Sequence, residues 1–382
     1  MIYLDNSATT PVDPRVAEAM APWHTREFGN PSSLHSYGRQ AREAVDQARA
    51  RVATLLGARP REIIFTASGT EADNLALIGT LKSASHLITS ATEHPAVLET
   101  ARALERQGVE TTIVPVSPEG VVDPETIRRA LRPSTRLISI MAANNVIGTI
   151  QPIGEIGRIA RAAGVLFHTD AVQATGKLRF DLASQQIDLL SLSAHKLHGP
   201  KGVGALFVRD GVTLEPVIHG GGQERGLRSA TENVPGIVGF GKAAELASAE
   251  MADDNVRLVR LRDHLIAGVQ AACPQAYLIG PPVQRLPGHV SLGFAGQEGE
   301  AIRLLLALDE AGIAASTGSA CSASHAAEPS YVLQALGFDP FRARGALRLT
   351  LGRFNTEAEV ERVIAVLPGL VGSLRRIATS RR

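Results

Sequence analysis

The chain has 382 residues, of which 44% are hydrophobic and 20% are charged, a composition typical of a globular protein with one large and one smaller domain. The net charge of +1 gives no electrostatic basis for binding nucleic acid or an anionic membrane surface. No apolar run approaches the roughly 18 residues of a membrane span. The N-terminus lacks a secretory signal, and the two cysteines do not indicate a disulfide framework, so we expect a cytoplasmic protein.

Strands and helices alternate along the first half of the chain. After an extended lead-in over residues 1–15, apolar spacing predicts helices over 15–26 and 38–56, the second ending at Gly57. The expected strands that follow are 62–66, 86–90, 111–116, 135–141, 165–170, 187–192 and 203–208. The expected helices between them are 72–81, 95–107, one opening at 123, and 154–163. This alternation predicts an α/β fold with a mostly parallel sheet between helices.

The second half begins with a glycine-rich loop over 219–226 and continues with a long helix over 235–272. A strand within 279–294, a helix over 298–311, a strand over 346–351 and a helix over 357–374 complete the chain. These elements predict a smaller α+β domain, with the passage between the domains near 250–257.

Polar side chains recur where the expected strands end. Ligands of open parallel sheets bind beyond the carboxyl ends of the strands. We therefore expect a shared site formed by Thr70, His94, Asn145, Asp170 and Gln173.

The turn 67–71 joins a strand to a helix and has two interpretations. Its small residues and hydroxyls are typical of a helix N-terminus that binds a phosphate group. Alternatively, Ser68 or Thr70 caps the helix and binds nothing.

The segment 193–202 lies between two buried strands and carries Lys196. Lysine is scarce in this chain, with five residues, and desolvation can turn a lysine amine into the nucleophile that forms a Schiff base. The alternative is a solvated polar loop. Asp170 likewise either caps a loop or pairs with an arginine, or it keeps a heteroaromatic nitrogen protonated, as pyridoxal 5'-phosphate (PLP) requires.

Cys321 lies in a run of small and polar residues, 315–325, which predicts an exposed loop and a candidate nucleophilic thiol. Cys273 follows two alanines and is expected to be structural. We expect no metal site, because His195 and His198 have no nearby acid or thiol to complete a ligand set.

Several motifs in order carry a family resemblance: YLDNSATT (3–10), FGNP (28–31), TEH (92–94), SAHKLHGPKG (193–202), GSAC (318–321) and LTLGRF (349–354). With them the chain resembles the NifS/IscS-type cysteine desulfurases, PLP enzymes of fold type I. The resemblance implies a large PLP-binding domain over 16–255. It also implies a small domain formed by 1–15 and 256–382 that carries the cysteine loop.

The resemblance also implies residue roles in cofactor binding. Lys196 would hold PLP through a Schiff base, His94 would stack on the ring, Asp170 would pair with the ring nitrogen and Gln173 would contact the ring oxygen. The other implied cofactor contacts are Gly69, Thr70, Asn145, Ser193, His195 and, from the partner subunit of a homodimer, Thr231.

For the reaction, the resemblance implies that Asn145 and Arg348 bind the carboxylate of L-cysteine. Lys196 and His94 would move protons, and Cys321 would take the sulfur as a persulfide, leaving L-alanine. The sulfur would pass to an acceptor or iron–sulfur scaffold protein, for cluster assembly or tRNA thiolation.

Two features depart from the family pattern. Val146 follows the paired asparagines where the family has glutamate, which puts the local hydrogen bonding in question. The chain also ends soon after Leu374, so we expect scaffold recognition to differ. Two alternatives stay open: an aminotransferase or selenocysteine lyase, which would not need Cys321, and a PLP-binding or sulfur-carrier protein without turnover.

Overall fold

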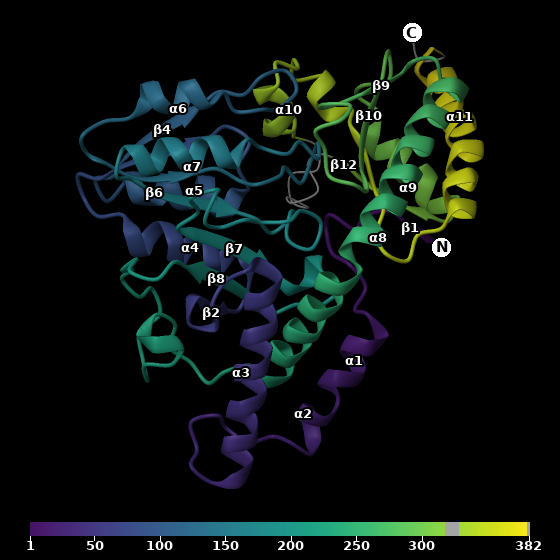
Figure 1. The fold of residues 1–382 in the computed structure, drawn as a ribbon. Helices are drawn as coiled ribbons and strands as arrows, with labels where there is room; N and C mark the ends of the chain where they lie inside the picture. Colours follow the sequence, from purple (N-terminus) through teal and green to yellow (C-terminus); the bar gives the residue numbers. More distant parts are fainter. Residues whose placement is uncertain (318–327, 380–382) are drawn as a thin grey trace.

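The computed structural model describes residues 1–317 and 328–379, with side chains up to residue 374. A seven-stranded sheet forms the centre of its larger part (Figure 1). Strands β7, β6, β5, β3 and β4 are parallel, whereas β8 is antiparallel to both β7 and β2. In spatial order the strands are β2 (Ile63–Thr66), β8 (Gly204–Val208), β7 (Leu189–Ser193), β6 (Leu166–Asp170), β5 (Thr135–Ser139), β3 (His86–Ser90) and β4 (Glu110–Val114). The expected mostly parallel sheet is confirmed.

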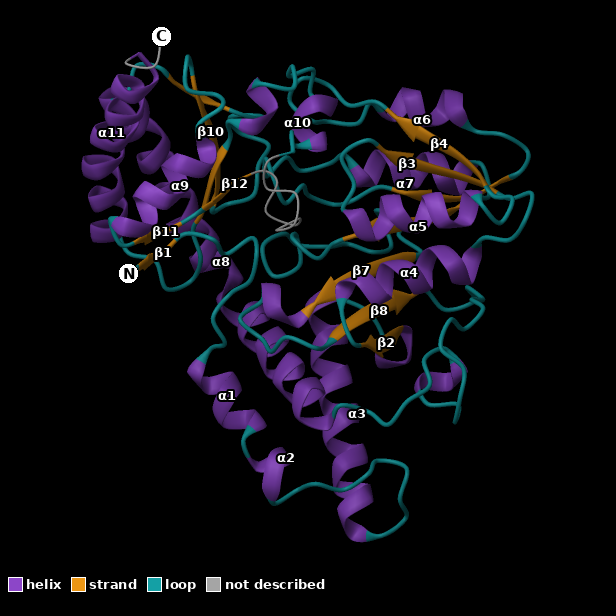
Figure 2. Ribbon diagram, turned by 180° about the vertical axis from the view of Figure 1, so that it is seen from behind, coloured by secondary structure: helices purple, strands orange, loops and turns teal. Residues whose placement is uncertain are grey.

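Helices cover both faces of this sheet (Figure 2). Successive side chains of a strand point to opposite faces, so Ile63 and Phe65 belong to one core cluster and Ile64 to another. The helices of the first cluster include α3 (Ser36–Leu56), α6 (Pro124–Ala130), α7 (Ile153–Ala162) and the first part of α8 (Val234–Ala272). Those of the second are α4 (Gly69–Thr80) and α5 (Pro95–Glu105).

The smaller part is built on a four-stranded antiparallel sheet with the order β12-β13-β10-β9, beside the parallel pair β1–β11. Its apolar core joins Leu4, the second part of α8 and two further helices, and it includes Cys273, which is therefore structural as expected. The remaining elements are β1 (Ile2–Tyr3), β9 (Ala276–Leu278), β10 (His289–Phe294), β11 (Ile313–Ala314), β12 (Ser316–Thr317), β13 (Leu347–Thr350), α9 (Ala301–Glu310), α10 (Tyr331–Ala335) and α11 (Glu357–Thr379).

Helix α8 runs without interruption from the large sheet to the smaller part (Figure 1). Its residues up to Leu246 belong to the core around the large sheet, and those from Leu258 belong to the core of the smaller part. The predicted division at 255/256 lies inside this helix and stays a prediction. None of the described helices is long and apolar enough to cross a lipid bilayer.

An arm projects from the body of the molecule at the start of α3 (Figures 1 and 2). The helix predicted over 15–26 is divided there into α1 (Pro14–Met20) and α2 (Pro22–Thr25), because Pro22 has no backbone N–H to continue the first helix. Helix α3 ends as predicted at Gly57, which adopts the left-handed conformation with φ 67°.

Candidate active site

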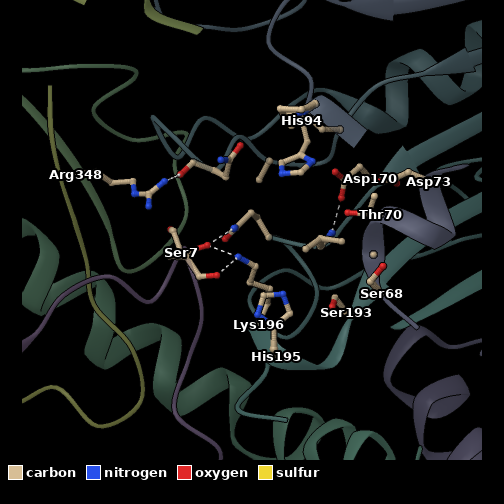
Figure 3. A pocket seen from close by; sticks show the side chains of 18 residues that line it. Ser7, Ser68, Thr70, Asp73, His94, Asp170, Ser193, His195, Lys196 and Arg348 are labelled. Carbon is tan, nitrogen blue, oxygen red and sulfur yellow. Dashed lines mark hydrogen bonds between the residues drawn. The ribbon is translucent and has the colours of Figure 1, made fainter. Parts of the chain in front are cut away.

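A cavity of about 430 Å³ opens at the carboxyl ends of the parallel strands (Figure 3). Most residues that the sequence singled out line it: Gly69, Thr70, His94, Asn145, Asp170, Gln173, Ser193, His195, Lys196 and Arg348. Thr231 is exposed and does not line the cavity of its own chain, and Cys321 lies outside the described residues. The structure thus brings together ten residues spread over almost 280 positions of the chain.

Lys196 follows β7 in a short 3-10 turn, Ala194–Lys196, which carries its side chain from the sheet edge into the cavity. Its amine Nζ donates to the backbone carbonyls of Ser7 and of Ala8, the latter at 2.7 Å. These carbonyls belong to the N-terminal segment, which crosses the mouth of the site from the smaller part of the molecule. Lys196 is therefore held by uncharged acceptors, an arrangement suited to an amine that must also react.

The N-terminus of α4 forms one end of the cavity. Ser68 caps this helix by accepting from the backbone N–H of Glu71 at 3.1 Å, so the capping interpretation holds for Ser68 and not for Thr70. A Cβ atom at Gly69 would lie 2.6 Å from Cγ2 of Val172, so the helix start packs against the turn after β6. Free backbone N–H groups at such a helix start, with Thr70 beside them, suit a phosphate group.

His195 and Ser193 lie at the same end, after β7. Burial, and then the charges of Lys196, Lys201 and Lys177, lower the pKa of His195 to about 4. Its imidazole is therefore neutral near pH 7 and can donate one N–H to an anion without adding a charge.

Asp170 is the last residue of β6 and lines the cavity. Its Oδ1 accepts from the backbone N–H of Val172 at 2.9 Å, and burial raises its pKa, opposed by the charges of His94 and Lys196. Asp73 lines the cavity beside it, and burial followed by the charge of Asp170 raises the pKa of that carboxyl as well. Two buried carboxyl groups side by side favour a cationic partner, such as a protonated ring nitrogen.

His94 lies across the cavity from Lys196 (Figure 3). Its Nδ1 accepts from the backbone N–H of Ala96 at 3.1 Å and caps α5, so Nε2 carries the proton of the neutral ring. Capping fixes the orientation of the imidazole, whose ring lines the cavity. The structural and functional interpretations of His94 are therefore compatible.

Arg348 belongs to β13 of the smaller sheet and is only 1% exposed. Its Nη1 donates to the carbonyl of Asn145 at 3.0 Å and its Nη2 to Oδ1 of Asp5 at 2.9 Å. Its Nε has no hydrogen-bond partner among the described residues. A buried guanidinium with an unused donor at the edge of a cavity is suited to a carboxylate ligand.

Among the polar lining residues, Ser7, Ser68 and Asp73 are not assigned a binding or catalytic role by the sequence. Ser7 contributes its main-chain carbonyl, for which a sequence carries no side-chain signal. The sequence predicts Ser68 only as a possible helix cap. Asp73 lies one helical turn after Thr70 on α4, and this spacing was the available signal for a second cavity-facing side chain.

Val146, the departure from the family pattern, is buried in a small apolar cluster with Ile147 and Leu333. The amide Oδ1 of Asn144 accepts from the backbone N–H groups of Val146 at 2.8 Å and Ile147 at 3.0 Å. The loop is thus stabilised by Asn144 and by apolar packing, and it needs no carboxylate at position 146.

Comparison with known proteins identifies the family of the chain. The aminotransferase class-V family matches residues 2–363. The chain belongs to this family. As a class-V aminotransferase, it is 51% identical over 381 residues to cysteine desulfurase IscS of Methanosarcina thermophila, a match that covers 99% of this chain and 93% of that protein. It is 49% identical over 383 residues to the IscS of Clostridium botulinum, with 99% and 96% covered.

Solved structures agree with these relatives. A NifS-like protein superimposes with a TM-score of 0.89 at 40% identity, covering 97% of this chain and 99% of that one. The protein SspA, whose structure was solved in complex with cysteine, gives a TM-score of 0.80 at 38% identity, with 93% and 100% covered. The predicted family and fold are confirmed.

Class-V aminotransferases use PLP, and the cavity offers a direct test of whether these residues fit that group. Gln173 donates through Nε2 to the carbonyl of Ser7 at 2.8 Å, whereas its buried Oε1 has no partner among the described residues. A ring hydroxyl in the cavity would satisfy that oxygen. With a helix N-terminus at one end, carboxyl groups at the other and an amine between them, the donor set fits PLP.

Proposed function

We propose that this class-V aminotransferase is a cysteine desulfurase, which converts L-cysteine to L-alanine and takes the sulfur on Cys321 as a persulfide. The observation that carries the proposal is the single cavity in which Lys196, Asp170 and Arg348 meet. It supplies an amine, a carboxyl pair and a guanidinium at three sides of one pocket. Identity of about half the residues with cysteine desulfurases over nearly the full length supports the same activity.

The residues that would hold PLP are those of the helix start and of the strand ends. Gly69, Thr70, Ser193 and His195 would bind its phosphate, and the larger set that orients the ring is His94, Asn145, Asp170, Gln173 and Lys196. When bound, PLP withdraws electrons from the alpha carbon of an amino acid and so weakens the bonds around it.

The protein side chains then have separate tasks in the reaction. Arg348 would bind the substrate carboxylate with its unused Nε and fork of donors, and the Asn145 amide would help to orient it. Lys196 and His94 lie on opposite sides of the cavity and would move protons at the alpha carbon. The Cys321 thiol would accept the substrate sulfur, so that cysteine plus thiol becomes alanine plus persulfide.

The proposal includes a homodimer and a sulfur acceptor. Thr231 is exposed and lies outside the cavity of its own chain, as expected of a residue that serves the phosphate of a partner subunit. The persulfide would pass to an acceptor or iron–sulfur scaffold protein, for cluster assembly or tRNA thiolation, in the cytoplasm.

The decisive experiment incubates the full-length protein with L-cysteine and measures two products. We expect alanine in solution and one added sulfur atom on the peptide that carries Cys321. Lys196→Ala should abolish both products, whereas Lys201→Ala, an exposed lysine of the same segment, should keep both.

Two outcomes would contradict the assignment. Full sulfide release by Cys321→Ser would favour a lyase that does not need the thiol. Normal alanine formation by Lys196→Ala would remove the lysine from the chemistry.

A further inference from the structure

Lys177 is a second lysine beside the site, and the reaction described above does not use it. Its Nζ donates to the backbone carbonyl of Gln173 at 2.9 Å, and no carboxylate lies within ion-pair distance of it among the described residues. By contrast, Lys82 pairs with Glu215 and Lys242 with Glu245, and Lys201 is exposed.

The surroundings of Lys177 are basic. Burial, and then the charge of Lys196, lower the pKa of Lys177 to about 7. Burial is also the main cause of the lowered pKa values of His195, His198 and His289, and the charge of Lys177 adds to it in each. The side chain of Lys177 is partly buried, and the amine in these basic surroundings is directed to the carbonyl of Gln173.

A chain of hydrogen bonds leads from Lys177 to the reactive amine. Lys177 holds the main chain of Gln173, and the side-chain Nε2 of Gln173 donates to the carbonyl of Ser7 at 2.8 Å. The Nζ of Lys196 donates to that same carbonyl. The position of the Gln173 main chain therefore affects the position of the Ser7 carbonyl, which accepts a hydrogen bond from Lys196.

Packing also connects the turn 173–177 with the segment that carries Lys196. A Cβ atom at Gly176 would lie 2.5 Å from Cδ2 of Leu197, the residue that follows Lys196. From the other side, Nδ2 of Asn255 on α8 donates to the carbonyl of Lys177 at 2.7 Å. The turn 173–177 is thus fixed between α8 and the Lys196 segment, with no free space at Gly176.

We propose that Lys177 is a positioning residue for the PLP site: by anchoring the main chain of Gln173 it sets the placement of the Gln173 amide, of the Ser7 carbonyl and, through them, of the Lys196 amine. This inference rests on the proposed function. It assigns Lys177 no contact with substrate or cofactor.

Lys177→Met separates positioning from folding. Methionine has a similar length and no charge, so the variant loses the donated hydrogen bond while burial becomes easier. We expect the thermal unfolding midpoint of the PLP-free protein to stay the same or rise. PLP should leave the dialysed holoenzyme about tenfold faster, the effect of one hydrogen bond to a charged group.

The test follows the visible absorption of bound PLP during dialysis for the wild type, Lys177→Met and Lys177→Arg, with Lys82→Met as the matched control on an exposed lysine. Lys177→Arg keeps a donor and should hold PLP more firmly than Lys177→Met. Lys82→Met should behave as the wild type. In steady-state assays, Lys177→Met should lower kcat more than it raises the KM for cysteine, because Lys177 is not placed at the substrate carboxylate.

Three results with the variants would overturn the inference. Wild-type retention of PLP by Lys177→Met would do so, as would a Lys177→Arg variant that loses PLP as fast as Lys177→Met. A lowered unfolding midpoint of Lys177→Met, matched by its PLP loss, would make the role structural. A wild type that takes up no PLP would refute the proposed function and this inference together, whereas normal wild-type uptake confines any failure to Lys177.

Discussion

Contacts within the protein fix several side chains of the cavity, and two of these side chains also keep a polar atom that could bind a ligand. His94 caps α5 through Nδ1, and Gln173 holds the Ser7 carbonyl through Nε2 while its Oε1 has no partner among the described residues. Arg348 is the strongest case, because two of its donors bind the protein and Nε faces no acceptor among the described residues. These hydrogen bonds hold the three side chains in position without a ligand.

Replacing Arg348 by lysine tests the carboxylate assignment. Lysine keeps the charge but loses the planar fork of donors, so we expect the KM for L-cysteine to rise about tenfold or more. The visible absorption of bound PLP should not change. Steady-state kinetics of Arg348→Lys beside Arg344→Lys, an exposed arginine before the same strand, measure this, and equal KM values for both variants would contradict it.

At the scale of elements, the site depends on how helices and strands begin and end at the sheet edge. Helix α4 starts against the turn after β6 with no space for a side chain at Gly69. Strands β5, β6 and β7 are linked across the sheet by His168, whose ring nitrogens lie 2.8 Å from Oγ of Ser139 and 3.0 Å from Oγ of Ser191. The contact at Gly69 leads to a prediction about PLP affinity, and the position of His168 leads to a prediction about stability at low pH.

Gly69→Ala should weaken PLP binding about tenfold, because the added methyl group displaces the helix start whose N–H groups would bind the phosphate. Gly154→Ala is the matched control, since its Cβ would lie 3.8 Å from the nearest atom, Cγ of Gln185. Alanine is the better helix former, so the control should be neutral or slightly stabilising. PLP titration of both variants followed by absorbance checks the difference, and equal affinities would remove the helix start from the phosphate site.

Acid should destabilise the fold through His168. Burial lowers its pKa from 6.5 to about 3, so below pH 6.5 the unfolded chain binds a proton that the folded protein refuses. The stability contributed by the neutral ring is complete above pH 6.5, and it falls by about 1.4 kcal/mol per pH unit as the pH decreases toward 3.

Urea unfolding of the wild type and of His168→Gln at about pH 7 and about pH 5 measures this contribution. Glutamine can still bond both serines but does not titrate, so the variant should lose less stability on acidification. An identical loss in both proteins would assign the effect to other groups, such as the buried His195 and His198.

At the scale of the whole molecule, the cavity is enclosed by segments from both parts of the fold. Lys196 and Asp170 come from the large sheet, Arg348 comes from the small one, and Ser7 comes from the N-terminal segment between them. The projecting arm carries the exposed side chains Leu34 (89%), Phe28 (69%) and Tyr37 (50%), which suit contact with a second subunit.

Leu34→Asp should therefore shift the proposed homodimer toward monomer and reduce PLP retention, since Thr231 would no longer reach a partner's phosphate. Val256→Asp, a substitution at a 75% exposed position of α8, should leave the assembly unchanged. Sedimentation velocity and the absorbance of bound PLP measure both effects. A dimer that persists in Leu34→Asp would exclude the arm from the interface.

The sequence by itself determined most of the local structure and the family. The strand expected over 86–90 matches β3 to the residue, and the helix expected over 235–272 matches α8 to within one residue at each end. The motifs around Lys196 and Cys321 pointed to the family to which the chain belongs. The sequence patterns did not predict β1, β9, β11, β12 and α10, because elements of two to five residues are too short to show a period.

Only the tertiary structure decided how these pieces meet. Nothing in the spacing of residues reveals that β8 runs antiparallel, that the Ser7 carbonyl accepts from Lys196, or that Lys177 reaches Gln173 in basic surroundings. These features depend on main-chain atoms, which are the same at every position of the sequence. They also depend on contacts between segments that are distant in the chain. Periodicity records which face of an element is buried, whereas the partner of a buried polar atom is set by packing.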